Sequence, residues 1–72
     1  MLIYRHDHRW YSIELVRDLF GDLVVVDRWG GVGKKASGAR RRVVTTCGQA
    51  RAVIRDTQKT RRKHGYRRVP RW

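Results

Sequence analysis

The sequence is poor in the features that mark secreted or membrane-spanning proteins. It contains one cysteine, Cys47, among 72 residues, which excludes an intramolecular disulfide framework and is typical of the reducing cytoplasm. The apolar run at residues 23–26 is far too short to cross a bilayer, and the N-terminus has no basic segment followed by a long apolar one. We therefore expect a cytoplasmic protein that is neither exported nor inserted into a membrane.

The sequence also offers few groups for catalysis or metal binding. Its six acidic residues are scattered, with no pair placed for acid–base chemistry. The segment GGVGKK at residues 30–35 lacks the spacing and the Ser or Thr of a phosphate-binding loop. His6 and His8 could face a zinc ion together, but a structural zinc site needs four ligands, and we interpret them as a polar domain edge. No enzymatic activity, cofactor or metal is expected.

Basic residues, in contrast, are abundant and unevenly distributed. The chain has 18 Lys and Arg against 6 Asp and Glu, a net charge of +12. Residues 1–33 hold four basic and five acidic side chains, whereas residues 34–72 hold fourteen basic and one acidic. Positive charge at this density opposes the compaction of a small domain and calls for a counterion. It predicts a nucleic-acid partner, with an acidic protein, a membrane surface or plain solubility as alternatives.

The first half of the chain has the pattern of antiparallel strands. Residues 10–20 alternate in the manner of a half-buried strand, and a further short strand is expected at residues 1–8. An edge strand is expected within residues 66–72, before Pro70, because the proline and the arginines discourage further pairing. In residues 10–20 one face holds Tyr11, Ile13, Leu15, Arg17 and Leu19, and the other holds Ser12, Glu14 and Asp18.

Glycines divide the middle of the chain. Gly21 and Asp22 predict a two-residue hairpin turn into a second strand at residues 23–29. The glycines at residues 30–33 predict a tight bend, followed by an exposed loop. The next strand is expected within residues 39–46, where alternation would place Arg40 and Arg42 on one face and Arg41 on the other.

One long helix is expected after the strands. Thr46 and Gln49 fit a capping box, and Gly65 after several cations fits a left-handed C-terminal cap. Cys47 lies in the apolar stripe and is expected to be a small buried side chain rather than a nucleophile. The apolar stripe is Cys47, Ala50, Val53, Ile54 and Thr57, and the basic stripe opposite is Arg51, Arg55, Gln58 and Arg62, with Lys59 and Lys63. Three or four antiparallel strands and one helix predict a two-layer α+β fold.

The order of these segments resembles the WGR domain. Trp29, Gly30, Val32 and Gly33 match its Trp-Gly-x-Val-Gly segment, with RDLFGD at residues 17–22 and RRKHGYRR at residues 61–68 in similar places. The resemblance covers about residues 10–69 of a single domain at 1–72. It implies a small twisted antiparallel sheet of three to five strands with one long helix packed on one face.

The family also implies a role. In DNA-dependent poly(ADP-ribose) polymerases such a domain contacts DNA near a break and relays the contact to a separate catalytic domain. Small bacterial proteins that are little more than this domain also belong to it. Here Gly31 stands where the family has the arginine of its Trp-Gly-Arg triplet. A guanidinium fork is thereby lost and the bend is expected to be more flexible, so break-specific recognition is not carried over.

We therefore expect a nucleic-acid-binding module, with DNA favoured over RNA and a protein adaptor for an acidic partner as the alternative from another class. Trp29 could stack on a terminal base or sugar, or could pack at the sheet edge. No membrane partner is expected. The candidate nucleic-acid-binding residues are Trp29, Gly30, Gly31, Lys34, Lys35, Arg40, Arg41, Arg42, Arg51, Arg55 and Arg62.

Overall fold

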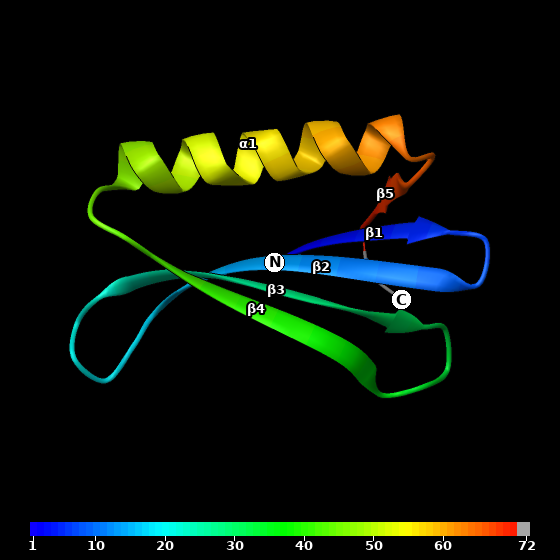
Figure 1. The fold of residues 1–72 in the computed structure, drawn as a ribbon, viewed down its shortest axis with the longest axis horizontal. Coiled ribbons are helices and arrows are strands. Elements are labelled where there is room, and N and C mark those ends of the chain that lie inside the picture. Colours follow the sequence, from blue (N-terminus) through cyan, green and yellow to red (C-terminus); the bar gives the residue numbers. More distant parts are fainter. Residues whose placement is uncertain (71–72) are drawn as a thin grey trace.

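In the computed structural model, which describes residues 1–70, one helix lies across one face of a five-stranded antiparallel sheet (Figure 1). Residues 71 and 72, including Arg71 of the basic half, lie outside the described residues. The predicted α+β fold is thus confirmed. The strands are β1 (Leu2–His6), β2 (Arg9–Arg17), β3 (Leu23–Gly31), β4 (Ala36–Val44) and β5 (Arg67–Val69), and the helix is α1 (Cys47–Lys63).

The sheet order is β4-β3-β2-β1-β5, and every neighbouring pair is antiparallel. The strands β1 to β4 follow one another as hairpins, so each lies beside its predecessor. From β4 at one edge, α1 crosses the sheet, and the chain returns as β5 beside β1 at the other edge (Figure 1). The prediction of a short edge strand before Pro70 is confirmed.

The connection between β2 and β3 differs from the predicted two-residue turn. The strand β2 ends at Arg17 and β3 begins at Leu23, which leaves a five-residue loop. The Asp18 carboxylate organises this loop, because its Oδ1 accepts hydrogen bonds from the backbone N–H groups of Phe20 and Asp22, both at 2.9 Å. Leu19, expected to lie on the strand face, is fully exposed in this loop.

The bend after Trp29 also lies later in the chain than predicted. Gly30 and Gly31 belong to β3 and pair with Trp10 and Arg9 of β2. The chain reverses instead at residues 32–35, where Gly33 has a φ of +79° that favours glycine. The strand β4 accordingly begins at Ala36 rather than near residue 39, and it ends before the two threonines.

Local chemistry sets both ends of α1. The Thr46 hydroxyl accepts a hydrogen bond from the Gln49 N–H at 3.1 Å, as predicted. The Gln49 amide oxygen reaches back to the N–H of Thr45 at 2.7 Å, one residue earlier than a capping box would have it. At the C-terminus Gly65 has a φ of +88°, and the Tyr66 N–H donates to the carbonyl of Arg61 in a Schellman motif.

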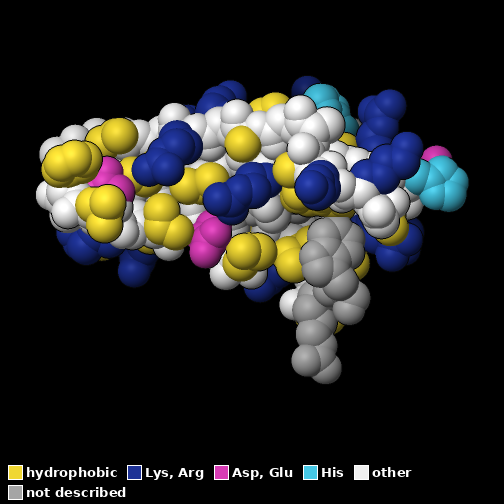
Figure 2. Space-filling view, turned by 90° about the horizontal axis from the view of Figure 1, so that it is seen from below, with side chains coloured by type: hydrophobic (Ala, Val, Ile, Leu, Met, Phe, Trp, Pro, Cys, Tyr) yellow, Lys and Arg dark blue, Asp and Glu magenta, His cyan; other side chains and the backbone are white. Residues whose placement is uncertain are grey.

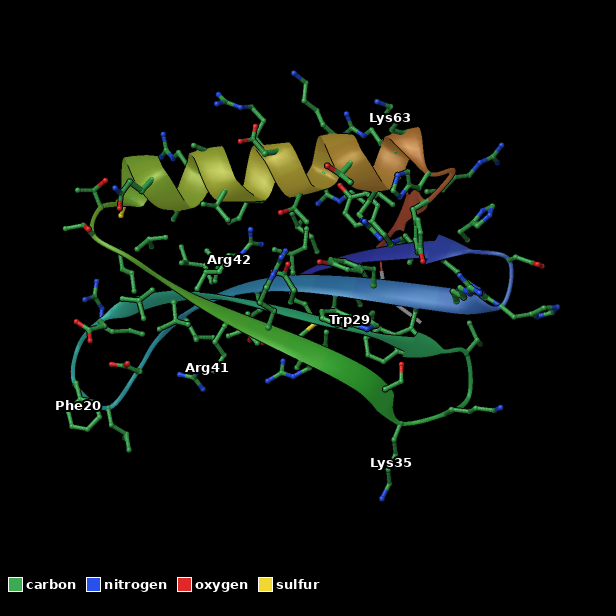
Figure 3. All side chains as sticks on the ribbon, viewed as in Figure 1. Phe20, Trp29, Lys35, Arg41, Arg42 and Lys63 are labelled. Carbon is green, nitrogen blue, oxygen red and sulfur yellow. The ribbon has the colours of Figure 1, made fainter. Side chains whose placement is uncertain are left out.

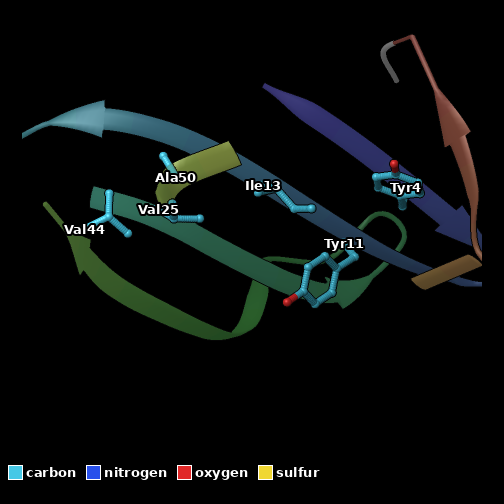
Figure 4. Close-up of a cluster of buried hydrophobic side chains, with 6 residues drawn as sticks. All are labelled: Tyr4, Tyr11, Ile13, Val25, Val44 and Ala50. Atoms are coloured by element: carbon cyan, nitrogen blue, oxygen red, sulfur yellow. The ribbon is translucent and has the colours of Figure 1, made fainter. Parts of the chain in front are cut away.

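The hydrophobic core lies between α1 and the sheet. Ala50 is the first residue of α1 that is buried in the core, and the partly buried Val53 and Ile54 pack against the core cluster. Cys47 is exposed, so the prediction of a buried thiol is wrong: the first turn of α1 precedes the residues that reach the core. Burial of apolar surface here is the main stabilising term of the fold. The core cluster, drawn in Figure 4, is Tyr4, Tyr11, Ile13, Val25, Val44 and Ala50.

The opposite face of the sheet has no second helix among the described residues. Ile3, Val24 and Val26 alternate with the core residues and therefore point away from α1, yet all three are buried. Figure 2 views the molecule from this side and shows apolar side chains interspersed with basic ones. At the β2–β3 loop Leu19 and Phe20 are almost fully exposed.

Candidate nucleic-acid interface

Trp29 packs on the sheet face that carries α1. It pairs with Tyr11 across β2 and β3, and the two rings are stacked, with centroids 5.8 Å apart and planes 10° from parallel. On β4 its cross-strand partner is Gly38, where an added Cβ would lie 2.4 Å from the indole Nε1. The indole is half-buried. The buried part of the indole therefore packs at the sheet, which is one of the two roles proposed for Trp29.

The two glycines after Trp29 serve different purposes. A Cβ at Gly30 would lie 3.0 Å from the Lys35 carbonyl oxygen, since a register irregularity between Trp29 and Gly30 brings β4 close. A Cβ at Gly31 would make only ordinary van der Waals contacts, the nearest with the Lys34 side chain at 3.5 Å and the His8 carbonyl oxygen at 3.8 Å. The backbone therefore needs glycine at position 30 and admits a side chain at position 31.

Trp10, which the sequence did not single out, holds this region in place. Its indole Nε1 donates a 2.9 Å hydrogen bond to the carbonyl oxygen of Gly31, which also accepts from the Lys34 N–H at 3.1 Å. The Val32 N–H donates to the His8 carbonyl at 2.7 Å. The segment after Trp29 is thus anchored to the β1–β2 turn, and the predicted flexibility of a bend at Gly31 does not apply to a strand held by these bonds.

Lys34 and Lys35 occupy the turn between β3 and β4. Both are exposed, and Lys35 projects away from the sheet (Figure 3). Neither forms an ion pair with another residue of the described chain. These lysines are free to meet an external anion, as their candidate role requires.

Arg40 and Arg42 share a face, as predicted, and converge on Asp27 of β3. The Asp27 carboxylate is fully buried, and its Oδ2 accepts from Arg42 Nη2 at 2.7 Å and from Arg40 Nη2 at 3.2 Å. Arg42 Nη2 also donates to the Thr57 hydroxyl of α1 at 3.1 Å. Both arginines thus have a structural role within the sheet, and Arg42 also connects the sheet to α1. Sequence reasoning did not single out Asp27.

Tyr11 donates a third hydrogen bond to the same carboxylate oxygen, at 2.6 Å. Burial, and next the hydrogen bond and negative charge of Asp27, raise the pKa of Tyr11 from 10.0 to about 12. The phenol therefore stays protonated at physiological pH and adds no negative charge to the basic surroundings.

Arg61 is a second residue that sequence reasoning did not place. It was counted only among the cations at the C-terminus of the helix. In the fold its guanidinium carbon lies 4.6 Å from the ring centroid of Tyr11 and 5.2 Å from that of Tyr66. The pairing depends on β2, α1 and the segment before β5 coming together, so no local pattern could indicate it.

The remaining candidate arginines lie on two further surfaces. Arg41 points away from α1 (Figure 3), on the same side as Val43 and next to the exposed β2–β3 loop. The outer-face arginines of α1 are Arg51, Arg55 and Arg62, all exposed. Of these, Arg55 lies 4.0 Å from Asp56. The eleven predicted residues therefore occupy several surfaces around the sheet and helix rather than one patch.

The histidines of the first hairpin have separate surroundings. His6 packs against the ring of Tyr66, with centroids 5.5 Å apart, whereas His8 is exposed beside Asp7. Within residues 1–70, no three His, Cys, Asp or Glu side chains are grouped as metal ligands. Likewise, α1 is neither long nor apolar enough to cross a bilayer.

Comparison with protein families gives one match. The model of the WGR domain matches residues 2–71, nearly the whole chain and more than the segment in which the resemblance was recognised. Searches of curated proteins and of solved structures found no match. The WGR family points to nucleic-acid interaction in general. With essentially every residue covered by that match, the chain belongs to the WGR-domain family.

Proposed function

We propose that this chain is a non-enzymatic DNA-binding module that holds the phosphate backbone with little preference for base sequence. One observation carries the proposal. Residues 34–70 contain thirteen Lys and Arg and one acidic residue. Ten of these thirteen have no carboxylate within ion-pair distance among the described residues, the exceptions being Arg40, Arg42 and Arg55.

A nucleic-acid backbone is the anion that suits this distribution. Phosphates recur along the strand, so cations on the outer face of α1 and at the β3–β4 turn could each neutralise one. Each neutralised phosphate releases condensed counterions, which favours binding at low salt. Arginines and lysines that contact phosphates fix the position of the protein on the nucleic acid. They do not read the base sequence, which requires contacts to base edges in the grooves.

A salt titration tests the proposal. Binding of a short labelled duplex DNA, followed by fluorescence anisotropy, should be micromolar or tighter at low salt. If about six phosphates are contacted, affinity should fall by roughly 10³-fold between 50 and 200 mM salt. Replacing Arg51, Arg55 and Arg62 together by Gln should reduce the log–log slope by about three. A flat salt response would overturn the proposal, and tighter binding of duplex RNA would reassign the partner.

The β2–β3 loop favours a second function, that of a protein adaptor. Leu19 and Phe20 are 100% and 89% exposed, and Val43 nearby is 69% exposed. The loop is held by the Asp18 hydrogen bonds, so these apolar side chains are presented by an ordered backbone. An acidic protein with an apolar cleft would match them and the neighbouring Arg17 and Arg41.

The two functions separate in a pull-down experiment. Capture of a protein partner that survives nuclease treatment and moderate salt, and is lost in Phe20→Ser, would support the adaptor. Loss of all capture after nuclease treatment, with DNA binding unchanged in Phe20→Ser, would support the DNA-binding module alone.

A further inference from the structure

A small hollow opens between β4 and α1. Its volume is about 180 Å³, and it is lined by Arg40, Arg42, Arg61, Tyr11 and the two threonines Thr57 and Thr60, with Asp56 at its side. Small-molecule pockets usually measure about 300 Å³ or more, so the hollow suits a single compact group.

The charges around the hollow favour an anion. Three guanidinium groups line it, and the one buried carboxylate beneath them, Asp27, is shared by Arg40 and Arg42. Arg61 has no ion-pair partner among the described residues. The four groups together therefore carry a net charge of +2. Asp56 also lines the hollow, where it is 73% exposed and lies 4.0 Å from Arg55, and counting it leaves a net charge of +1.

The hydrogen-bonding groups also call for an acceptor. At the hollow the Nε atoms of Arg42 and Arg61 are buried donors that make no hydrogen bond in the described structure, against one such acceptor beneath them, Oδ1 of Asp27. Buried donors without partners are costly, and a bound ion or water is a common explanation. Both threonine hydroxyls already donate to carbonyl oxygens one turn earlier, at 2.9 and 3.0 Å. The guanidinium groups are thus the donors available to a ligand.

We propose that the β4–α1 hollow is a binding site for one phosphate group, held chiefly by the guanidiniums of Arg61 and Arg40. Arg42, which rises from β4 toward α1 (Figure 3), is fixed by Asp27 and Thr57 and also lines the hollow. Planar guanidinium forks match phosphate oxygens in pairs, and a partly buried site strengthens the contact. The inference rests on the proposed function in that the phosphate is a phosphodiester of the bound nucleic acid.

Phosphate alone tests the site independently of DNA. Inorganic phosphate is titrated into the protein at constant ionic strength, with chloride as the control, and amide chemical shifts are recorded. Saturable shifts confined to Arg40, Thr57, Thr60 and Arg61 are expected. Unsaturable shifts spread over the outer-face arginines and the lysines of the β3–β4 turn would overturn the proposal.

Variants connect the hollow to DNA. Arg61→Gln should lower DNA affinity by about tenfold, because it loses a charge-assisted contact in a partly buried site, and should abolish the phosphate shifts. Arg62→Gln, on the outer face one residue along, is the matched control and should cost about threefold or less. Arg61→Lys keeps the charge without the fork and should recover only part of the affinity. Thermal melting verifies that each variant is folded.

The failures of the two proposals can be told apart. DNA binding with a steep salt slope, with equal losses for Arg61→Gln and Arg62→Gln and no saturable phosphate shifts, would overturn the site and leave the DNA-binding function. If phosphate gives saturable shifts in the hollow but the protein does not bind DNA, the phosphate site stands. The proposed DNA-binding function, and with it the assignment of the phosphate to a phosphodiester, is then overturned.

Discussion

Asp27 and Arg42 form an ion pair of 2.7 Å in which the carboxylate is fully buried and the arginine side chain is 29% exposed. Because the same carboxylate oxygen also binds Tyr11 and Arg40, one aspartate connects β2, β3 and β4, and Arg42 extends the connection to α1 through Thr57. In a domain of this size, where the core is small, such a connection contributes to both stability and the placement of basic side chains.

The first prediction concerns this carboxylate. Asp27→Asn removes the negative charge that holds two guanidiniums, and we expect a loss of about 2 kcal/mol in the free energy of unfolding by urea. Glu14→Gln is the control, because Glu14 meets Arg28 in a solvent-exposed pair at 3.4 Å and should cost less than about 1 kcal/mol. Equal losses for the two variants would show that the buried network contributes no more to stability than an exposed ion pair does.

The second prediction concerns the contact between Trp29 and Gly38. Because a Cβ at Gly38 would lie 2.4 Å from the indole, Gly38→Ala should displace the ring and destabilise the fold by about 1–3 kcal/mol. The near-ultraviolet circular dichroism of the tryptophans should change as well. Gly48→Ala, in the first turn of α1 with its nearest neighbour at 3.7 Å, should instead be neutral or stabilising by up to about 1 kcal/mol. Unchanged stability of Gly38→Ala would contradict the packing.

The third prediction restores the family's arginine. Position 31 has room for a side chain and a backbone that does not require glycine, so Gly31→Arg should leave the melting temperature nearly unchanged. An added guanidinium beside Trp29 should raise the affinity for duplex DNA by about three- to tenfold. Gly30→Ala serves as the contrast, since its Cβ would meet backbone at 3.0 Å, and it should be destabilised. Unaltered DNA affinity in a folded Gly31→Arg would show that this position faces away from the nucleic acid.

The fourth prediction concerns alkaline pH. The pKa of Tyr11 is about 12 in the folded chain against a reference value of 10.0, so the unfolded chain releases this proton first. The stability contributed by the phenol is therefore complete below pH 10 and is lost as the pH rises to about 12. Urea unfolding across this range should show the decline, and Tyr11→Phe should show a smaller slope. The same slope in both proteins would exclude Tyr11 as its source.

The elements whose signals are local could be read from the sequence. The caps at Thr46 and Gly65 act within a few residues of the chain, so they marked the ends of α1 correctly. Alternation assigned Arg40 and Arg42 to one face, which the register with β3 confirms. The β2–β3 loop escaped prediction because apolar residues continue past Arg17, while the Asp18 carboxylate closes the loop.

The sequence by itself determined the family, the α+β class, the ends of the helix and the concentration of positive charge in the second half, because these depend on residue type and on short-range spacing. Tertiary structure alone decided which cations share a surface. Asp27 meets Arg42 through strand pairing across fifteen positions, and Arg61 reaches Tyr11 only because α1 crosses back over β2. Such contacts follow from sheet register and helix packing, which local residue patterns do not contain.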